Sequence, residues 1–167
     1  MKTILLSLAA LAVAPVFAQE NPMLAKLAGH WNTSKQFTLA VADQMPAADY
    51  SFKPNKDEMS FGEQMAHIAT SNAYFFSVLT GEKSPIAKPA DYEKATVMKL
   101  LGDSFDYCAG ILPKLTPEQL HGIYDTPDGK MTGFEVILFA MDHTAHHRGQ
   151  TEVYLRVKNI KPTDYRF

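Results

Sequence analysis

The amino-acid sequence predicts an all-α protein built as a four-helix bundle. Apolar residues recur at helical spacing in four long segments, and two of these segments begin with a Ser/Thr-x-x-Glu capping box. Prolines and glycines interrupt the helical pattern between the segments. The sequence has no repeat, no low-complexity tract and no convincing strand, and its long connections leave the order of helix packing open.

The first 18 residues have the form of a secretory signal peptide. Lys2 precedes an apolar stretch over residues 4–14, and Val16 and Ala18 occupy positions −3 and −1 of a cleavage site. An uncleaved membrane anchor is the weaker alternative, because the apolar run is shorter than the roughly 20 residues that span a bilayer. We therefore expect a signal peptide at residues 1–18, cleavage after Ala18, and a periplasmic or secreted protein without a membrane anchor.

Cleavage would leave 149 of the 167 residues, which suits one domain with a substantial core, so we expect a single domain over residues 19–167. Lys2 is the only charged residue of the leader. The 16 basic residues therefore fall to 15 against 18 acidic residues, and the formal charge becomes −3. Because the chain also has no basic block, nothing indicates binding to nucleic acid or electrostatic attachment to a membrane.

The first helical segment follows Asn21 and Pro22. Its apolar residues keep the spacing of an amphipathic helix up to Met45. Pro46 ends the helix, because the proline ring disfavours helical geometry in the preceding residue. Residues 46–59 contain two prolines and many turn-forming residues, so they form an irregular connection.

The second helical segment begins with a capping box, in which the side chains of Ser60 and Glu63 satisfy free backbone donors reciprocally, and Gly81 is a suitable stop. A proline-containing loop separates it from a third helix over about residues 96–115, and Pro113 near the end of this segment either kinks or terminates the helix. This helix contains Cys108, the only cysteine, so the chain has no internal disulfide. The apolar surroundings of Cys108 indicate a small core residue, with a thiolate nucleophile as the alternative.

The last part of the chain adds a short helix, an excursion and the fourth long helix. Pro117 occupies the favoured first position of the short helix. Residues 123–131 form an exposed excursion with a turn signal at Pro-Asp-Gly. Thr132 and Glu135 then form the capping box of the fourth helix, which extends to about Val157.

The fourth helix contains the most informative motif, since three of the six histidines fall within five residues. His143 and His147 share one face of a helix. His146 lies one residue before His147, so its side chain points about 100° away around the helix axis. This spacing allows one helix to supply two metal ligands. His67 is the other histidine near a bundle-facing position of a predicted helix, which makes it the candidate third ligand.

Three imidazoles with a free coordination position are typical of a catalytic metal site, whereas structural zinc sites usually have four protein ligands. Imidazole ligands suit zinc, nickel or iron(II) and do not identify the metal. Alternatively, the three histidines are hydrogen-bonded core residues that bind no metal.

Two stretches resemble the histidine motifs of the DinB/YfiT-like family, a group of four-helix bundles with proposed metal-dependent activities. The stretches are SFGEQMAHIA at residues 60–69 and DHTAHHRGQ at residues 142–150, and the likeness extends over most of the chain after the leader. The resemblance implies a four-helix bundle with metal ligands at His67, His143 and His147. It also suggests a homodimer.

The resemblance further implies that a divalent metal acts as a Lewis acid and lowers the pKa of a water or thiol toward neutrality. His146, Arg148 and Gln150 complete the motif without being expected to bind the metal. Arg148 either contacts an acid or an anionic substrate or lies in solvent. Glu63 is interpreted as a helix cap, with a catalytic base as the alternative.

These features predict a metal-dependent enzyme with a small-molecule substrate, either hydrolase-like or thiol-transferase-like. Export disfavours thiol transfer, because low-molecular-weight thiols belong chiefly to the cytosol, whereas hydrolysis requires only water. The competing hypothesis is a non-catalytic metal-binding or interaction bundle. The sequence identifies neither the substrate nor a general base.

Overall fold

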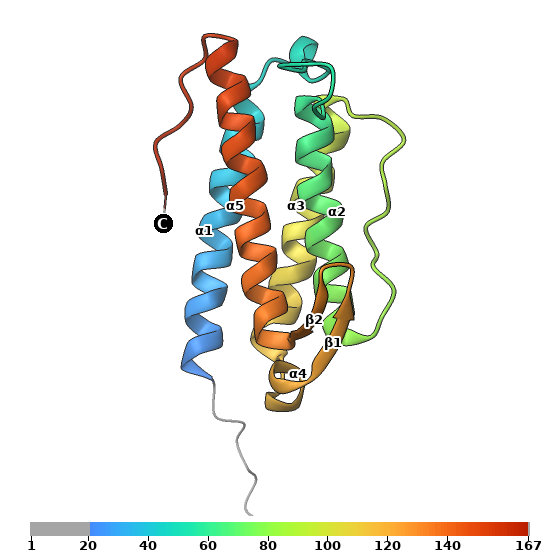
Figure 1. Ribbon diagram of the computed structural model, residues 1–167. Coiled ribbons are helices and arrows are strands. Elements are labelled where there is room, and N and C mark those ends of the chain that lie inside the picture. The colour runs from blue at the N-terminus through green and yellow to red at the C-terminus, as the bar shows by residue number, and fades with distance from the viewer. Residues whose placement is uncertain (1–20, 167) are drawn as a thin grey trace, which may run out of the picture.

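The computed structural model describes residues 21–166 and shows four long helices packed side by side, which confirms the predicted fold class (Figure 1). The helices are α1 (Pro22–Gln44), α2 (Phe61–Thr80), α3 (Lys94–Ile111) and α5 (Gly133–Val157). The predicted signal peptide at residues 1–18 and its cleavage site lie outside the described residues. Within residues 21–166, no helix combines the length and apolarity needed to cross a membrane.

Both predicted capping boxes are present at the starts of α2 and α5. Ser60 Oγ accepts a hydrogen bond from the Glu63 N–H at 3.2 Å, and Glu63 Oε2 accepts one from the Ser60 N–H at 2.7 Å. Thr132 and Glu135 form the same two bonds at 3.2 and 2.7 Å. Gly81 caps the end of α2 directly after Thr80, and its φ of 71° is the left-handed conformation that glycine adopts without strain. The sequence therefore defines the ends of α2 correctly.

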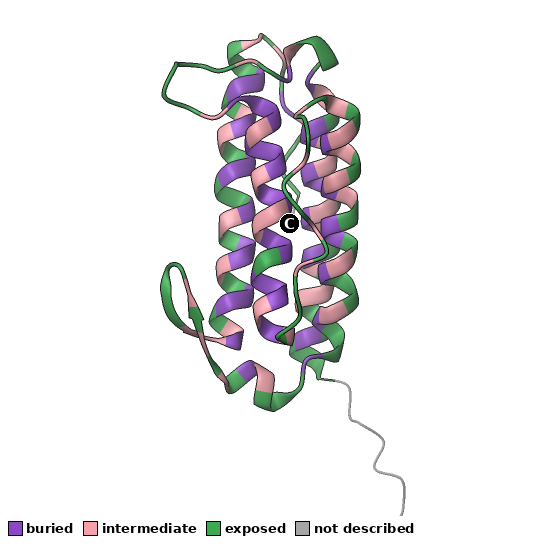
Figure 2. Ribbon diagram, turned by 90° about the vertical axis from the view of Figure 1, so that its right-hand side faces the viewer, coloured by how far each residue is buried: buried purple, intermediate pink, exposed green. Residues whose placement is uncertain are grey.

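The core lies between the four long helices, where an aromatic cluster joins three of them. The ring of Trp31 lies 5.0 Å from that of Phe76 and 5.1 Å from that of Phe105, and its indole N–H donates to the Phe105 carbonyl at 3.1 Å. Buried residues recur at helical spacing along each long helix, with exposed residues between them, as in an amphipathic helix (Figure 2). Cys108 is a fully buried free thiol, and burial raises its pKa well above the ordinary value, which supports a packing role.

Helix α3 ends earlier than the predicted limit of about residue 115. The helix stops at Ile111, and residues 112–114 continue as a 3₁₀ turn that contains Pro113. Proline lacks the N–H that an α-helix needs at this point, so the chain changes to the tighter turn. The short helix α4 (Pro117–His121) begins at Pro117, as predicted.

The expectation of a chain without strands is wrong between α4 and α5. Strands β1 (Ile123–Thr126) and β2 (Gly129–Thr132) form an antiparallel hairpin around the predicted Pro-Asp-Gly turn. Each strand has only four residues. Exposed and half-buried positions alternate in β1, but its sequence Ile-Tyr-Asp-Thr does not alternate apolar and polar residues, and β2 alternates in neither respect, so the sequence lacks the period-2 signal. Because β2 leads directly into α5, the hairpin folds back beside α2 (Figure 1).

Candidate metal centre

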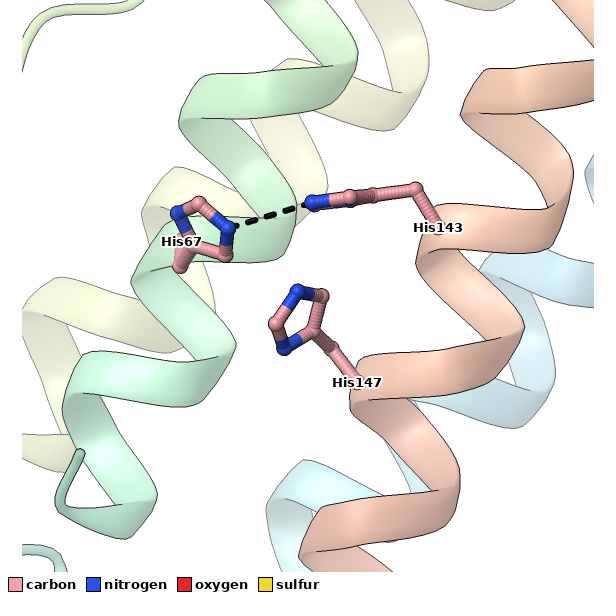
Figure 3. A group of neighbouring side chains, drawn as sticks. All are labelled: His67, His143 and His147. Atoms are coloured by element: carbon pink, nitrogen blue, oxygen red, sulfur yellow. Dashed lines mark hydrogen bonds between the residues drawn. The ribbon is translucent and has the colours of Figure 1, made fainter. Parts of the chain in front are cut away.

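The three histidines singled out in the sequence come together between α2 and α5 (Figure 3). His67 points from α2 toward His143 and His147, which lie one turn apart on α5. Each residue offers one ring nitrogen, and these three nitrogens all lie within 4.8 Å of one another. Within residues 21–166, no aspartate, glutamate, cysteine or further histidine belongs to this group.

The spacing of two of these nitrogens matches that of ligands around one ion. His67 Nε2 and His143 Nε2 are 3.1 Å apart. Two nitrogens bound tetrahedrally to zinc at 2.0–2.1 Å would be separated by about 3.3 Å. In the metal-free protein one of the two nitrogens must carry a hydrogen, since two lone pairs repel each other. The donor atoms and their spacing therefore fit a divalent ion.

Burial favours the uncharged form of all three imidazoles. Burial lowers the pKa of His67 from its ordinary value, and it lowers the pKa of His143 and His147 to about 4. The second cause, for His143 and His147, is repulsion between neighbouring imidazolium charges, to which the nearby His146 contributes. Because metals bind the neutral imidazole, the cluster presents three nitrogen donors at neutral pH.

Gln64 is part of this centre, although the sequence did not single it out. Gln64 Oε1 lies 2.6 Å from His147 Nδ1, and Gln64 Nε2 donates to the Tyr154 hydroxyl at 3.3 Å. Gln64 precedes His67 by three residues and Tyr154 follows His147 by seven. Helical spacing therefore places Gln64 with His67 on one face of α2 and Tyr154 with His147 on one face of α5. It does not show which side chains meet across the two helices.

His146 and Gln150 lie outside the cluster. His146 is exposed, and its Nε2 lies 3.1 Å from Gln150 Nε2. Glu63, the alternative candidate for a catalytic base, caps α2 and forms an ion pair with Lys53 at 3.3 Å. The structure therefore supports the capping role for Glu63.

Arg148 occupies neither of the two environments expected for it. It is 7% exposed, and it forms no ion pair with an acidic residue in the part of the chain that the structure describes. Its Nη1 donates to Ser34 Oγ at 3.1 Å and to Thr38 Oγ1 at 3.3 Å, and its guanidinium lies 4.3 Å from the centre of the Phe37 ring. Arg148 thus fastens α5 to α1.

A pocket of about 470 Å³ opens beside His67 and His143. Its remaining lining comes from α2, α5 and the hairpin tip, namely Thr70, Ser71, Tyr74, Phe75, Pro127, Asp128 and Phe139. A second pocket of about 320 Å³ lies on another side of His67, under the loop between α2 and α3. Three larger pockets, of about 490, 620 and 810 Å³, contain none of the three histidines, so size alone does not locate the candidate site.

Comparisons with known proteins agree with this description. Residues 30–151 match the DinB superfamily. The uncharacterized protein YjoA of Bacillus subtilis is 31% identical over 136 residues, which cover 78% of this chain and 88% of YjoA. The crystal structure of YjoA, a DinB-like protein, matches with a TM-score of 0.71 and 28% identity over 84% of this chain and 96% of that one. A DinB-like protein from Bacillus cereus shares the fold, with a TM-score of 0.72 and 17% identity over 85% and 97% of the two chains.

Proposed function

Because the chain belongs to the DinB superfamily and gathers three imidazoles between α2 and α5, we propose that it binds one divalent metal ion through His67, His143 and His147. The observation that carries this proposal is the convergence of three ring nitrogens within 4.8 Å. Zinc, nickel and iron(II) all accept imidazole ligands, so these are the candidate ions.

We further propose that the metal centre is catalytic. The group contains no fourth protein ligand among residues 21–166, and three protein ligands with an open position are typical of catalytic zinc. A divalent ion bound there supplies Lewis acidity, which polarises a carbonyl group and makes water or a thiol more acidic. The pocket beside His67 and His143 would admit a small molecule. Its lining contains Asp128 and no lysine or arginine, which favours a neutral or cationic substrate.

Two reaction classes fit this centre, and the proposed export favours one of them. If residues 1–18 direct the chain out of the cytosol, hydrolysis needs no cosubstrate other than water, whereas thiol transfer needs a low-molecular-weight thiol. We therefore favour a hydrolase-like activity over a thiol-transferase-like one. A homodimer is a further prediction, which light scattering after size-exclusion chromatography would test.

The metal content of the untagged protein, purified from an export compartment without chelators, tests the centre. We expect about one zinc, nickel or iron per chain, since three ligands from one cluster hold one ion. His67→Ala and His143→Ala should each lose this metal, because each removes a ring nitrogen from the group. His146→Ala is the matched control, since it removes an exposed imidazole next to the cluster and should retain the metal. Equal loss in all three variants would contradict the assignment of the ligands.

The open coordination position is tested on the same protein after substitution with cobalt(II), whose visible absorption reports its ligands. Addition of a small thiol or azide should change the spectrum of the wild-type protein, since either can occupy a free position. An unchanged spectrum would indicate a closed site, and the non-catalytic metal-binding bundle would then be the better description. His146→Ala should respond as the wild type does.

A further inference from the structure

We propose that Gln64 and Tyr154 form a hydrogen-bond relay that holds His147 in one tautomer, with a hydrogen on Nδ1 and a free lone pair on Nε2. This inference rests on the proposed metal-binding function and deepens it. It assigns positioning roles to two residues that lie outside the three-histidine group.

The relay consists of three consecutive contacts, which join three buried side chains to the carbonyl group of the half-buried Met59. His147 Nδ1 lies 2.6 Å from Gln64 Oε1, Gln64 Nε2 lies 3.3 Å from the Tyr154 oxygen, and that oxygen lies 2.9 Å from the carbonyl oxygen of Met59. His147, Gln64 and Tyr154 are 9%, 1% and 4% exposed. Because the residues are largely shielded from solvent, a broken contact would leave a buried polar group without a partner.

The direction of the relay is set at its far end. The Met59 carbonyl can only accept a hydrogen bond, so Tyr154 must donate its hydroxyl hydrogen to it. The Tyr154 oxygen can then only accept, so the part of Gln64 that faces it must be the amide NH₂ group. The Gln64 carbonyl oxygen therefore faces His147 Nδ1, which must carry a hydrogen. A neutral imidazole has one ring hydrogen, and Nε2 of His147 is left free to bind a metal.

Packing holds the far end of the relay in place. The ring of Tyr154 lies 6.2 Å from that of Phe52 and 6.5 Å from that of Phe61. Met59 immediately precedes Ser60, the N-cap of α2, so the turn that begins this helix also presents the carbonyl group. The start of α2 and the orientation of a metal ligand on α5 are thereby coupled.

The other two histidines have weaker second contacts or none among the described residues. His67 Nδ1 lies 3.5 Å from Ser71 Oγ, and His143 Nδ1 is buried without a hydrogen-bond partner. A hydrogen bond to the second nitrogen orients a metal-binding imidazole and makes it a stronger donor. His147 is accordingly the best oriented of the three proposed ligands.

Zinc affinity, measured by competition with a chromophoric chelator, tests the role of Gln64. In Gln64→Leu we expect the dissociation constant for zinc to rise roughly 10- to 100-fold, since both of its contacts are lost. Gln64→Glu keeps an oxygen next to Nδ1 but loses the NH₂ group that donates to Tyr154, so its affinity should lie between those of Gln64→Leu and the wild type. Gln44→Leu is the matched control, because this glutamine also makes two amide hydrogen bonds, with the Lys161 carbonyl and the Thr163 N–H, and lies outside the relay. An unchanged affinity in Gln64→Leu would overturn the proposal.

Tyr154→Phe tests the next contact and is paired with Tyr50→Phe. Tyr50 is also buried, and its hydroxyl donates to the Ala42 carbonyl at 2.8 Å without touching the metal centre. Both variants lose a buried hydroxyl–carbonyl bond, so both should melt at a lower temperature. Only Tyr154→Phe should weaken zinc binding, and by less than Gln64→Leu does. Equal zinc affinities in the two variants would contradict a positioning role for Tyr154.

Long-range proton–nitrogen NMR of the metal-free protein reads the tautomer directly. We expect His147 to carry its hydrogen on Nδ1 in the wild type and to populate both tautomers in Gln64→Leu. A wild-type His147 with its hydrogen on Nε2 would overturn the relay, even if zinc binding is established. Conversely, a protein that binds no metal but has the expected tautomer would contradict the proposed function and support the relay.

Discussion

His147 and Arg148 are adjacent in the chain but serve different sides of α5. His147 faces Gln64 on α2, whereas Arg148 donates to Ser34 and Thr38 on α1. One residue along a helix corresponds to a rotation of about 100°, so neighbours can contact different helices. A buried guanidinium is tolerated here because hydroxyl groups accept its hydrogen bonds and an aromatic face packs against it. Arg148 is therefore better explained by helix packing than by substrate binding.

Arg148→Ala should destabilise the protein and leave the metal centre intact. We expect a loss of about 2–4 kcal/mol of unfolding free energy, because the substitution leaves a cavity and removes the contacts to α1. Urea unfolding followed by circular dichroism measures this loss. The control is Arg156→Ala on the same helix, where an exposed arginine pairs with Glu152 at 3.7 Å, and its effect should stay within about 0.5 kcal/mol. Loss of bound metal in Arg148→Ala would contradict the packing role.

At the scale of elements, capping boxes define where the two histidine-bearing helices begin. Ser60 and Glu63 start α2, and Thr132 and Glu135 start α5. Backbone hydrogen bonding to Ser60 lowers the pKa of Glu63, and the Ser60 side chain and Lys53 act in the same direction. The folded state thus favours the ionised form of Glu63 more than the unfolded state does. Its stabilising contribution is present above the ordinary pKa of 4.5 and is lost as the pH falls through the lower folded value.

Glu63→Gln should reveal this pH dependence. Glutamine can still accept the bond from Ser60, but it lacks the charge that favours a helix N-terminus and the pairing with Lys53. We expect the wild type to be more stable by about 0.3–1 kcal/mol at pH 7. The difference should shrink as the pH falls below 4.5, which urea unfolding across the pH range would measure. Glu82→Gln, at an exposed position beyond the end of α2, is the control. A difference that persists unchanged at low pH would exclude this explanation.

At the scale of the whole molecule, the proposed metal would join segments that are far apart in sequence. His67 and His143 are separated by 76 residues, yet their Nε2 atoms lie 3.1 Å apart. The unfolded chain does not hold these nitrogens together, so a metal should bind the folded state preferentially. Metal binding would therefore stabilise the bundle as a whole.

Zinc should raise the melting temperature of the wild-type protein, and a chelator should lower it again. Free zinc at 100 times its dissociation constant adds about 2.7 kcal/mol to the unfolding free energy. Calorimetry with and without chelator measures the shift, with His67→Ala as the variant that should not respond. If the melting temperature of the wild type is the same in zinc and in chelator, the three histidines are core residues and not ligands.

Much of the fold follows from local chemistry that a sequence displays. Helical periodicity and Pro46 gave the end of α1, Ser60 and Gly81 gave the two ends of α2, and the box at Thr132 gave the start of α5. These signals are reliable because caps and breakers act on the backbone within a few residues of themselves. The hairpin was missed because its short strands are stabilised by pairing with each other and by their place beside α5.

The sequence alone determined the fold class, the helix ends at Pro46, Ser60, Gly81 and Thr132, and the shared face of His143 and His147. It offered His67 as the candidate third ligand, and the structure brings His67 to the other two histidines between α2 and α5. Spacing along one helix settles which residues share a face, because that relation is fixed by helix geometry. Only the tertiary structure decided that Gln64 and Tyr154 contact each other and that Arg148 is buried against α1. These contacts depend on the register and rotation of one helix against another, which the packing of the entire core determines.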